Sequence, residues 1–192
     1  MAKKTIILKK GKEVNVQRRH PWIFSGAIKK IADGIEEGDL VRVVDYNNNF
    51  LSNGHWQNGS IAMRNISFID SSINAKFWVQ KIKDAAAYRR QLGLPASENN
   101  AFRLIFGEGD NLPGLVIDWY DGNAVVQCHS IGMYHSRHTI SEALQTVFKD
   151  KLKTIYCQSG ETLPSALGIE DEFLYGDAES AIVSEHEHKF EI

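Results

Sequence analysis

The chain has 192 residues, a formal net charge of −2, 43% hydrophobic residues and 24% charged residues. This length allows one large or two small domains with a buried core, and the composition excludes extended disorder. No apolar stretch approaches the roughly 20 residues that span a bilayer, and no apolar segment follows the N-terminal lysines, so we expect neither a membrane span nor a secretory signal. Two cysteines without such a signal, Cys128 and Cys157, indicate free thiols in a reducing cytoplasm.

The charge is unevenly distributed along the chain. Residues 1–30 carry nine Lys or Arg and one acidic residue, residues 31–92 carry seven of each sign, and residues 93–192 carry six basic and 16 acidic residues. A basic N-terminal segment in a chain whose C-terminal half is acidic indicates that the N-terminal segment binds a polyanion. The alternative is a set of solvated lysines at one end of the chain.

Short β-branched segments separated by turn residues dominate the first 70 residues. We expect strands at Thr5–Lys9, Leu40–Asp45, Phe50–Gln57 and Ile61–Ile66. The segment Pro21–Ile31 suits a short helix that Pro21 opens. Several short strands with one helix predict a small β-barrel over residues 1–72.

The pattern changes after residue 70. Ser71 and Ser72 supply capping residues for a helix that runs to about Leu92 and begins a second domain. Strands are expected at Phe102–Phe106, Leu115–Tyr120, Ala124–His129 and Thr154–Gln158, with a helix at Tyr134–Phe148. The turn Asp121-Gly122-Asn123 is a strong hairpin signal between two of these strands.

This order of elements predicts an α/β sandwich over residues 73–180, and hence an α+β fold class for the chain. The tail from Ser159 is acidic and weakly patterned, with short strand signals at Ile182–Ser184 and Lys189–Ile192. We expect this tail to be poorly anchored. The abrupt end within the last strand signal suggests a fragment, with residues 181–192 leading into a further domain.

The segment from Gly107 to Gly114 begins with Gly-x-Gly after a predicted strand, as a dinucleotide or S-adenosylmethionine loop would. The third glycine comes too late and a strand follows where a helix is needed. A structured β-turn fixed by Pro113 and Gly114 is favoured instead. Glu108, Asp110 and Asp118 form a carboxylate cluster in the sequence that could perform acid–base chemistry or bind a divalent cation, but a salt bridge for Glu108 and turn capping by Asp110 are favoured.

No histidine cluster predicts a metal centre. His135 and His138 would share a helix face, and His186 and His188 a strand face, but neither pair has a third ligand at suitable spacing. We therefore expect no metal and no catalytic residue in this chain. Cys128 and Cys157 lie in predicted strands, where buried, inert thiols are the usual case.

The strongest candidate for function is the basic and aromatic segment from Arg18 to Lys30. Its basic residues can neutralise phosphates, Ser25 and Gly26 can offer close backbone contact, and aromatic planes can stack on unpaired bases. Ile23 and Phe24 are expected to fill the barrel core. The candidate RNA-binding residues are Arg18, Arg19, His20, Trp22, Ser25, Gly26, Lys29 and Lys30.

Two motifs carry a resemblance to a known family. Arg18–Ile28, with its core His-Pro-Trp-Ile-Phe-Ser-Gly-Ala-Ile, resembles the start of the bacterial large-subunit ribosomal RNA cytosine-5 methyltransferases, the RlmI-like enzymes that use S-adenosylmethionine (SAM). Phe102–Glu108 continuing into Leu112–Tyr120 resembles the second signature of that family. Family members usually carry Asp-Gly-Leu-Pro-Gly in this signature, whereas Asn111 follows Asp110 here; Asn tolerates the left-handed conformation that Gly would supply.

The resemblance implies an RNA-binding PUA domain, a central α+β domain and a C-terminal Rossmann-like methyltransferase domain that is absent from this chain. It implies that the parent enzyme uses SAM, whereas this chain binds no cofactor and is inactive alone. It also implies that the partner is large-subunit ribosomal RNA and that the protein is cytoplasmic. The alternative function is a protein–protein interaction or dimerisation module without RNA affinity, and a homodimer is left open.

Overall fold

The computed structural model describes residues 4–177, 180–186 and 188–192. Contacts divide the chain into two compact units, each made of three segments. The first unit contains Met1–Ser72, Gly107–Gly114 and Ser130–His135. The second contains Ile73–Phe106, Leu115–His129 and Ser136–Ile192. The sequence-based domain boundaries at residues 72/73 and 180/181 stay predictions.

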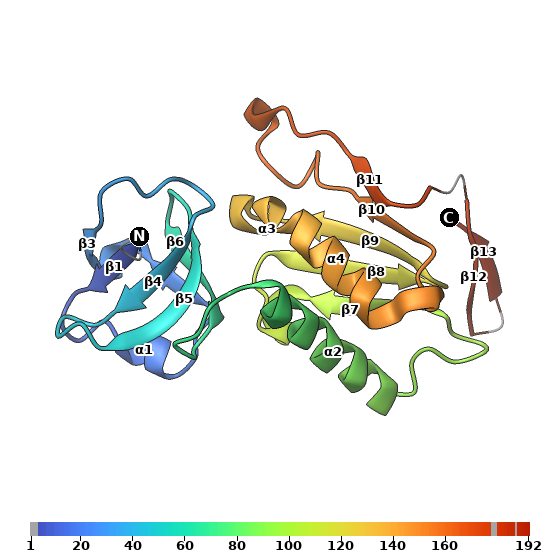
Figure 1. Cartoon of the computed structure of the whole chain (residues 1–192), viewed down its shortest axis with the longest axis horizontal. Helices are drawn as coiled ribbons and strands as arrows, with labels where there is room; N and C mark the ends of the chain where they lie inside the picture. Colours follow the sequence, from blue (N-terminus) through green and yellow to red (C-terminus); the bar gives the residue numbers. More distant parts are fainter. Residues whose placement is uncertain (1–3, 178–179, 187) are drawn as a thin grey trace. The chain divides into compact units, whose positions relative to one another are not determined.

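A six-stranded sheet forms the first unit (Figure 1). Its strands, in chain order, are β1 (Thr5–Leu8), β2 (Trp22–Phe24), β3 (Ile28–Ile31), β4 (Leu40–Val44), β5 (Phe50–Trp56) and β6 (Ile61–Ser67). Their spatial order is β2-β6-β5-β4-β1-β3; β1 and β4 pair in parallel and the other neighbours are antiparallel.

The connection between the two edge strands forces this sheet to curl. In a flat sheet β2 and β3 would lie roughly 24 Å apart, at about 4.8 Å per strand spacing. Only the three-residue 3₁₀ turn η1 (Ser25–Ala27) joins them, and a link of that length reaches at most about 14 Å. The sheet therefore closes on itself as a half-barrel around a core that includes Ile6, Leu8 and Val43, each fully buried.

The predicted helix at Pro21–Ile31 is wrong. The segment forms β2, η1 and β3 instead, and a short helix α1 (Val14–Gln17) that the sequence did not indicate precedes it. Pairing with neighbouring strands outweighs the local pattern here: Ile23 pairs with Met63 of β6, and Lys30 pairs with Ile7 of β1.

Two later segments complete the first unit. Gly132 of α3 (Ile131–His135) packs beneath the ring of His55, so that a Cβ at residue 132 would lie 2.2 Å from the His55 Cγ. His55 is 4% exposed, and its Nδ1 has no hydrogen-bond partner among the described residues. Burial, with smaller contributions from His135 and Arg64, lowers the pKa of His55 to about 4, so the ring is neutral at pH 7.

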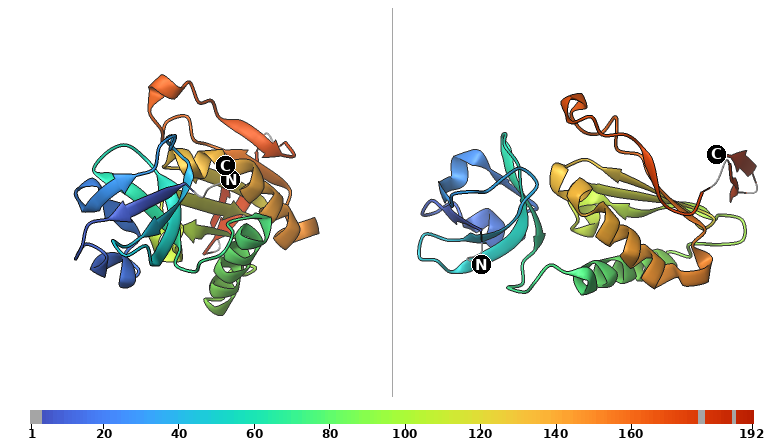
Figure 2. Two further views of the ribbon diagram at one scale, coloured as in Figure 1. Left: turned by 60° about the vertical axis from the view of Figure 1, so that its left-hand side comes forward. Right: turned by 45° about the horizontal axis from the view of Figure 1, so that its top comes forward.

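The second unit is a five-stranded sheet covered by helices. Its strands are β7 (Ala101–Phe106), β8 (Leu115–Tyr120), β9 (Asn123–Cys128), β10 (Thr154–Cys157) and β11 (Glu172–Tyr175). Their order is β11-β10-β9-β8-β7, and only β9 and β10 run parallel among these neighbours. Helices α2 (Ala75–Gln91) and α4 (Arg137–Phe148) lie side by side on one face of this sheet (Figure 2).

Burial follows the alternation of each strand. In β8 the side chains of Leu115, Ile117 and Trp119 are buried, whereas Val116, Asp118 and Tyr120 between them are half-buried. The predicted hairpin turn is confirmed: Asp121 and Gly122 both have positive φ, 47° and 94°, between the antiparallel strands β8 and β9. The α+β class, with a small curled barrel and a helix-on-sheet layer, is confirmed.

Several predicted boundaries shift. Asn74 caps α2 by accepting from the N–H groups of Lys76 and Phe77, so Ser71 and Ser72 are not the capping residues. The single helix predicted at Tyr134–Phe148 is two helices, α3 and α4. The tail is better patterned than expected, because β11 pairs with β10, and β12 (Ile182–Glu185) pairs with β13 (His188–Glu191).

Both cysteines are free and buried in adjacent strands, as the sequence predicts. The neighbouring Cys128 thiol lowers the pKa of Cys157 to about 7, while the Cys157 thiol and burial raise the pKa of Cys128. Of the helices in the described ranges, none has the length and apolar character that crossing a bilayer requires.

Candidate nucleic-acid interface

The cations of the first 30 residues differ in what they contact. Lys4 pairs with Asp39; desolvation opposes ionisation of that carboxyl, but the Lys4 hydrogen bond and the Glu36 N–H together hold its pKa below the usual value. Lys9 Nζ donates to the Gly26 carbonyl at 2.9 Å. The remaining lysine and arginine side chains that are exposed and make no ion pair with a described residue are Lys10, Lys12, Arg18, Arg19, Lys29 and Lys30.

A buried asparagine fixes the turn that carries Arg18, Arg19 and His20. Asn65 of β6 is 1% exposed; its Nδ2 donates to the His20 carbonyl at 2.9 Å, and its backbone N–H donates to the Pro21 carbonyl at 2.7 Å. Its Oδ1 accepts from Ser52 Oγ at 2.8 Å. Neither Asn65 nor Ser52 was predicted as part of the site. The sequence did carry a signal for them, because each is a polar residue within a predicted strand.

Arg19 adopts a left-handed backbone conformation, with φ of 62°, directly after α1. Its N–H donates to the Val16 carbonyl at 2.8 Å, and the His20 N–H donates to the Asn15 carbonyl at 2.9 Å. A non-glycine residue in this conformation costs free energy, so the surrounding hydrogen bonds determine the turn. The exposed side chains of Arg18, Arg19 and His20 are thereby presented from a fixed backbone.

His20, Trp22 and Phe24 form a row of rings. The Trp22 N–H donates to His20 Nδ1 at 3.1 Å; the rings of His20 and Trp22 meet edge-on at 6.1 Å, and those of Trp22 and Phe24 at 6.5 Å. Ile23, between them, is buried in the core as predicted. The prediction that Phe24 fills the core is wrong: strand alternation turns its side chain outward, and 48% of it is exposed.

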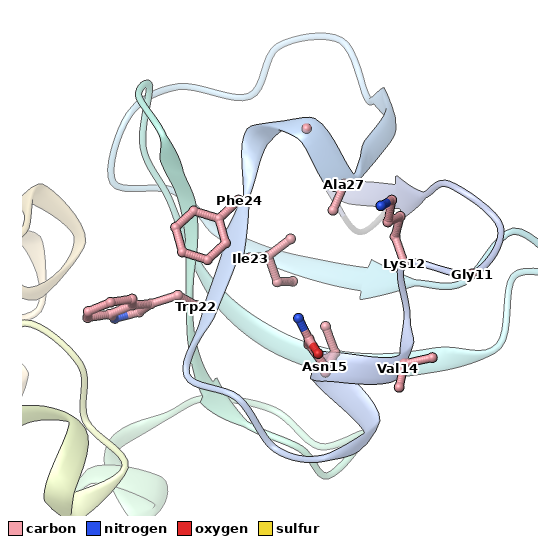
Figure 3. Close-up of a pocket in the computed structure, with 10 residues that line it drawn as sticks. Gly11, Lys12, Val14, Asn15, Trp22, Ile23, Phe24 and Ala27 are labelled. Carbon is pink, nitrogen blue, oxygen red and sulfur yellow. The ribbon is translucent and has the colours of Figure 1, made fainter.

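Trp22 and Phe24 line a groove of about 420 Å³ in the first unit. Figure 3 shows Trp22 and Phe24 along one side, with Lys12 and Val14 on the other and the Asn15 side chain reaching in from α1. An apolar floor with aromatic walls, a nearby ammonium and an amide can accept the face of an unpaired base and its phosphate.

The groove contains only part of the predicted set. Trp22 and Gly26 line it; Lys12, Asn15 and Phe24 also do, and none of these three was in the predicted set. Arg18, Arg19 and His20 lie on the preceding turn, Ser25 begins η1, and Lys29 and Lys30 lie on β3. The Ser25 N–H donates to the Ser60 carbonyl, while a Cβ at Gly26 would meet nothing within 4 Å, so this turn is open to solvent.

The segment Gly107–Gly114 forms a turn, as predicted, with 3₁₀ geometry over Gly107–Asp110 (η2). Asn111 has a φ of 56°, which confirms its left-handed conformation. Glu108 makes no ion pair with any residue that the structure describes, in contrast to the predicted salt bridge; its Oε1 accepts the Trp22 indole N–H at 2.9 Å within the first unit. Burial lowers the pKa of Arg64, and the Glu108 carboxylate offsets part of that effect.

This loop does not fit a SAM site. The residues after it form β8, which pairs antiparallel with β7, so no helix begins here whose N-terminal N–H groups could face a ligand. Within residues 4–177, 180–186 and 188–192, no group of three or more His, Cys, Asp or Glu side chains is arranged to hold a metal ion.

Comparisons with known proteins agree with the two signatures. Residues 6–68 match the PUA-like domain family. Ribosomal RNA large subunit methyltransferase I of Tolumonas auensis is 38% identical over 146 residues, which cover 75% of this chain and 36% of that protein. The protein of the same name from Salmonella paratyphi C is 33% identical over 147 residues, covering 76% of this chain and 36% of that protein.

Solved structures show the same fold. A chain from Streptococcus mutans assigned as a SAM-dependent methyltransferase superposes with a TM-score of 0.78 at 17% identity, covering 98% of this chain and 48% of that one. A second chain, assigned as a methyltransferase and complexed with SAH, gives a TM-score of 0.77 at 17% identity, covering 98% and 47%. The chain thus spans about a third to a half of the proteins it matches. It carries a PUA-like domain and is similar to the N-terminal portion of ribosomal RNA large subunit methyltransferase I.

Proposed function

We propose that this chain is the RNA-binding portion of a SAM-dependent methyltransferase that modifies a cytosine at carbon 5 in large-subunit (23S) ribosomal RNA. The chain positions the RNA, and a Rossmann-like domain elsewhere in the longer protein binds SAM and transfers the methyl group. The 192 residues alone are inactive and bind no SAM. The two free, buried thiols are consistent with a cytoplasmic setting.

One observation carries the proposal: a fixed turn and an open aromatic groove in the PUA-like domain are surrounded by cations without internal ion pairs. Arg18, Arg19, His20, Lys29 and Lys30 engage the RNA backbone; Trp22 contacts unpaired bases, and Ser25 and Gly26 shape the surface between them. Exposed cations without an acidic partner inside the described structure retain their full charge for phosphates.

Filter binding of ribosomal RNA across a salt series tests the proposal. Replacing Arg18, Arg19 and Lys29 with Ala should weaken binding about 100-fold at low salt and lower the slope of log K against log salt by about 2. A matched control replaces three exposed lysines of the second unit, Lys76, Lys83 and Lys189, with Ala. Binding that ignores salt, or that falls equally in both triple variants, would overturn the proposal.

The alternative function, dimerisation without RNA affinity, has one observation in its favour. On the sheet face opposite the helices, a groove of about 520 Å³ is lined by Tyr120, Tyr156 and Phe173, and the rings of Tyr156 and Phe173 contact each other with centroids 4.8 Å apart and planes tilted by 52°. Phe173 is 44% exposed. Sedimentation at several concentrations distinguishes the two functions: a tight dimer that Phe173→Ser dissociates, in a protein without RNA affinity, would favour dimerisation.

A further inference from the structure

A further groove lies within the second unit. It occupies about 510 Å³ where the last turn of α2, the end of α4 and the strands β7 and β8 come together. This volume falls in the range of about 300–1,000 Å³ that is typical of ligand pockets. Sequence analysis indicated no site here.

Aromatic rings form much of the lining. Phe102 of β7 and Phe148 at the end of α4 are half-buried, so part of each ring is open to solvent. Trp119 of β8, 5% exposed, stacks on Phe148 with ring centroids 4.3 Å apart and planes tilted by 33°. These rings are held in place by packing, and a planar aromatic ligand could extend the stack at low entropic cost.

The rim of the groove is basic although the surrounding sequence is acidic. Residues 93–192 contain 16 acidic and six basic residues, yet two of those six, Lys149 and Lys151, line this groove together with Arg90 of α2 and a single acid, Asp150. All three cations are exposed and make no ion pair with any residue in the described ranges. By contrast, the neighbouring Lys153 pairs with Asp121 at 2.8 Å.

The two lysines are presented by a fixed turn. Lys149 has a positive φ of 49° at the point where α4 ends and the 3₁₀ turn η3 (Lys149–Lys151) begins. The N–H of the buried Leu152 donates to the Lys149 carbonyl at 2.9 Å and anchors the turn. Helix C-termini favour cations, which accounts for each of these residues singly. It does not account for an aromatic groove between them.

We propose that this groove binds an unpaired nucleotide of the same RNA, with the base against the aromatic lining and its flanking phosphates at Arg90, Lys149 and Lys151. The inference rests on the proposed function and adds a second RNA contact, in the α+β domain. An apolar partner would not require a basic rim, and stacked rings beside exposed cations are the combination that single-stranded RNA uses.

Charge reversal tests the site in the 192-residue chain, with a fluorescein-labelled single-stranded oligoribonucleotide as the probe. Arg90→Glu with Lys149→Glu should weaken binding about tenfold and lower the salt slope by about 1.4. The matched control, Lys76→Glu with Lys83→Glu, makes the same charge change at exposed positions of α2 outside the groove and should change affinity less than twofold. Thermal melting checks that both variants fold.

Crosslinking provides a second measurement that does not depend on variants. A 4-thiouridine oligoribonucleotide should crosslink to peptides containing Phe102, Trp119 or Phe148. If the groove binds a nucleotide within a longer RNA, excess uridine monophosphate at millimolar concentration should not prevent this crosslink. Crosslinks confined to the PUA-like domain, or equal losses in the two charge-reversal variants, would overturn this inference. So would a groove variant that alters only sedimentation, which would indicate a protein partner.

The design separates the two proposals. If the Arg18, Arg19 and Lys29 variant loses affinity while the Arg90 and Lys149 variant binds as the original chain does, the proposed function stands and the second contact fails. If the original chain shows no salt-dependent RNA affinity, both fail.

Discussion

The two units differ in the polar side chains that their sheets bury. In the first unit the ribbon of β5 and β6 carries buried polar side chains, namely Ser52, Asn53, His55, Asn65 and Ser67. In the second unit the sheet and its helices bury mainly apolar side chains, such as Leu104, Ile117 and Ile140. Both units bury an apolar core, and in the first unit directional hydrogen bonds and close backbone approach act in addition to it. A rigid turn needs such hydrogen bonds, because apolar packing alone does not fix the direction of a carbonyl.

The largest expected effect tests close backbone approach in the first unit. A Cβ at Gly54 would lie 2.2 Å from the Arg64 carbonyl oxygen across the β5–β6 pair. Because backbone atoms cannot move aside, Gly54→Ala should lower the free energy of unfolding by about 4 kcal/mol. Urea denaturation measures it. Gly26→Ala, where a Cβ meets nothing within 4 Å, is the control and should change stability by less than about 0.5 kcal/mol.

The next effect is a pH dependence that arises from His55. Its pKa is lowered from 6.5 to about 4, so the unfolded chain binds a proton more readily than the folded chain. Stability should be full above pH 6.5 and fall as the pH drops towards 4, by up to about 3 kcal/mol. Urea denaturation between pH 4 and 7.5 measures it. In His55→Phe this slope should flatten; an unchanged slope would assign it to another group.

A smaller effect is expected at Asn65, which links stability to recognition. Asn65→Ala leaves the His20 carbonyl and Ser52 hydroxyl without their partner, so we expect a loss of about 2 kcal/mol. The turn with Arg18 and Arg19 should also loosen and RNA affinity should fall severalfold. Ser67→Ala, at another buried polar position of β6, is the control for stability without the turn. Equal RNA affinity in both variants would contradict the positioning role of Asn65.

The smallest effect belongs to the second unit. Asn74→Ala removes the side chain that accepts from the N–H groups of Lys76 and Phe77, and should cost about 1 kcal/mol. Asn74→Ser should restore most of it. Ser71→Ala, at a position outside the cap, should have no measurable effect on stability. If Ser71→Ala destabilised the chain as much as Asn74→Ala, the assigned start of α2 would be wrong.

The sequence predicts elements best where local and tertiary signals agree. The strand at Leu115–Tyr120 and the turn after it were predicted closely, because alternation, β-branched residues and Asp121-Gly122 all indicate a hairpin. Pro21–Ile31 was mispredicted because its pairing partners lie far along the chain, in β1 and β6. Local patterns cannot show that pairing.

The candidate site divides in the same way. Exposed cations such as Arg18 and Lys29 can be identified from charge alone. The Phe24 side chain points outward because residues alternate along a strand, and the predicted helix placed it in the core instead. Asn65 holds the turn with Arg18 and Arg19 only because strand pairing brings Asn65 to the His20 carbonyl. Arg90 and Lys149 are 59 positions apart in the sequence, so only the packing of α2 and α4 brings them to one groove.

The discontinuous make-up of the first unit limits its use as a portable module. A gene segment ending at Ser72 would encode the whole curled sheet but neither Gly107–Gly114 nor Ser130–His135. The transplanted sheet would expose the His55 ring to water, where Gly132 covers it, and would leave the Trp22 indole without Glu108. A recombination event that moved the first unit into another protein would therefore have to carry these two later segments as well.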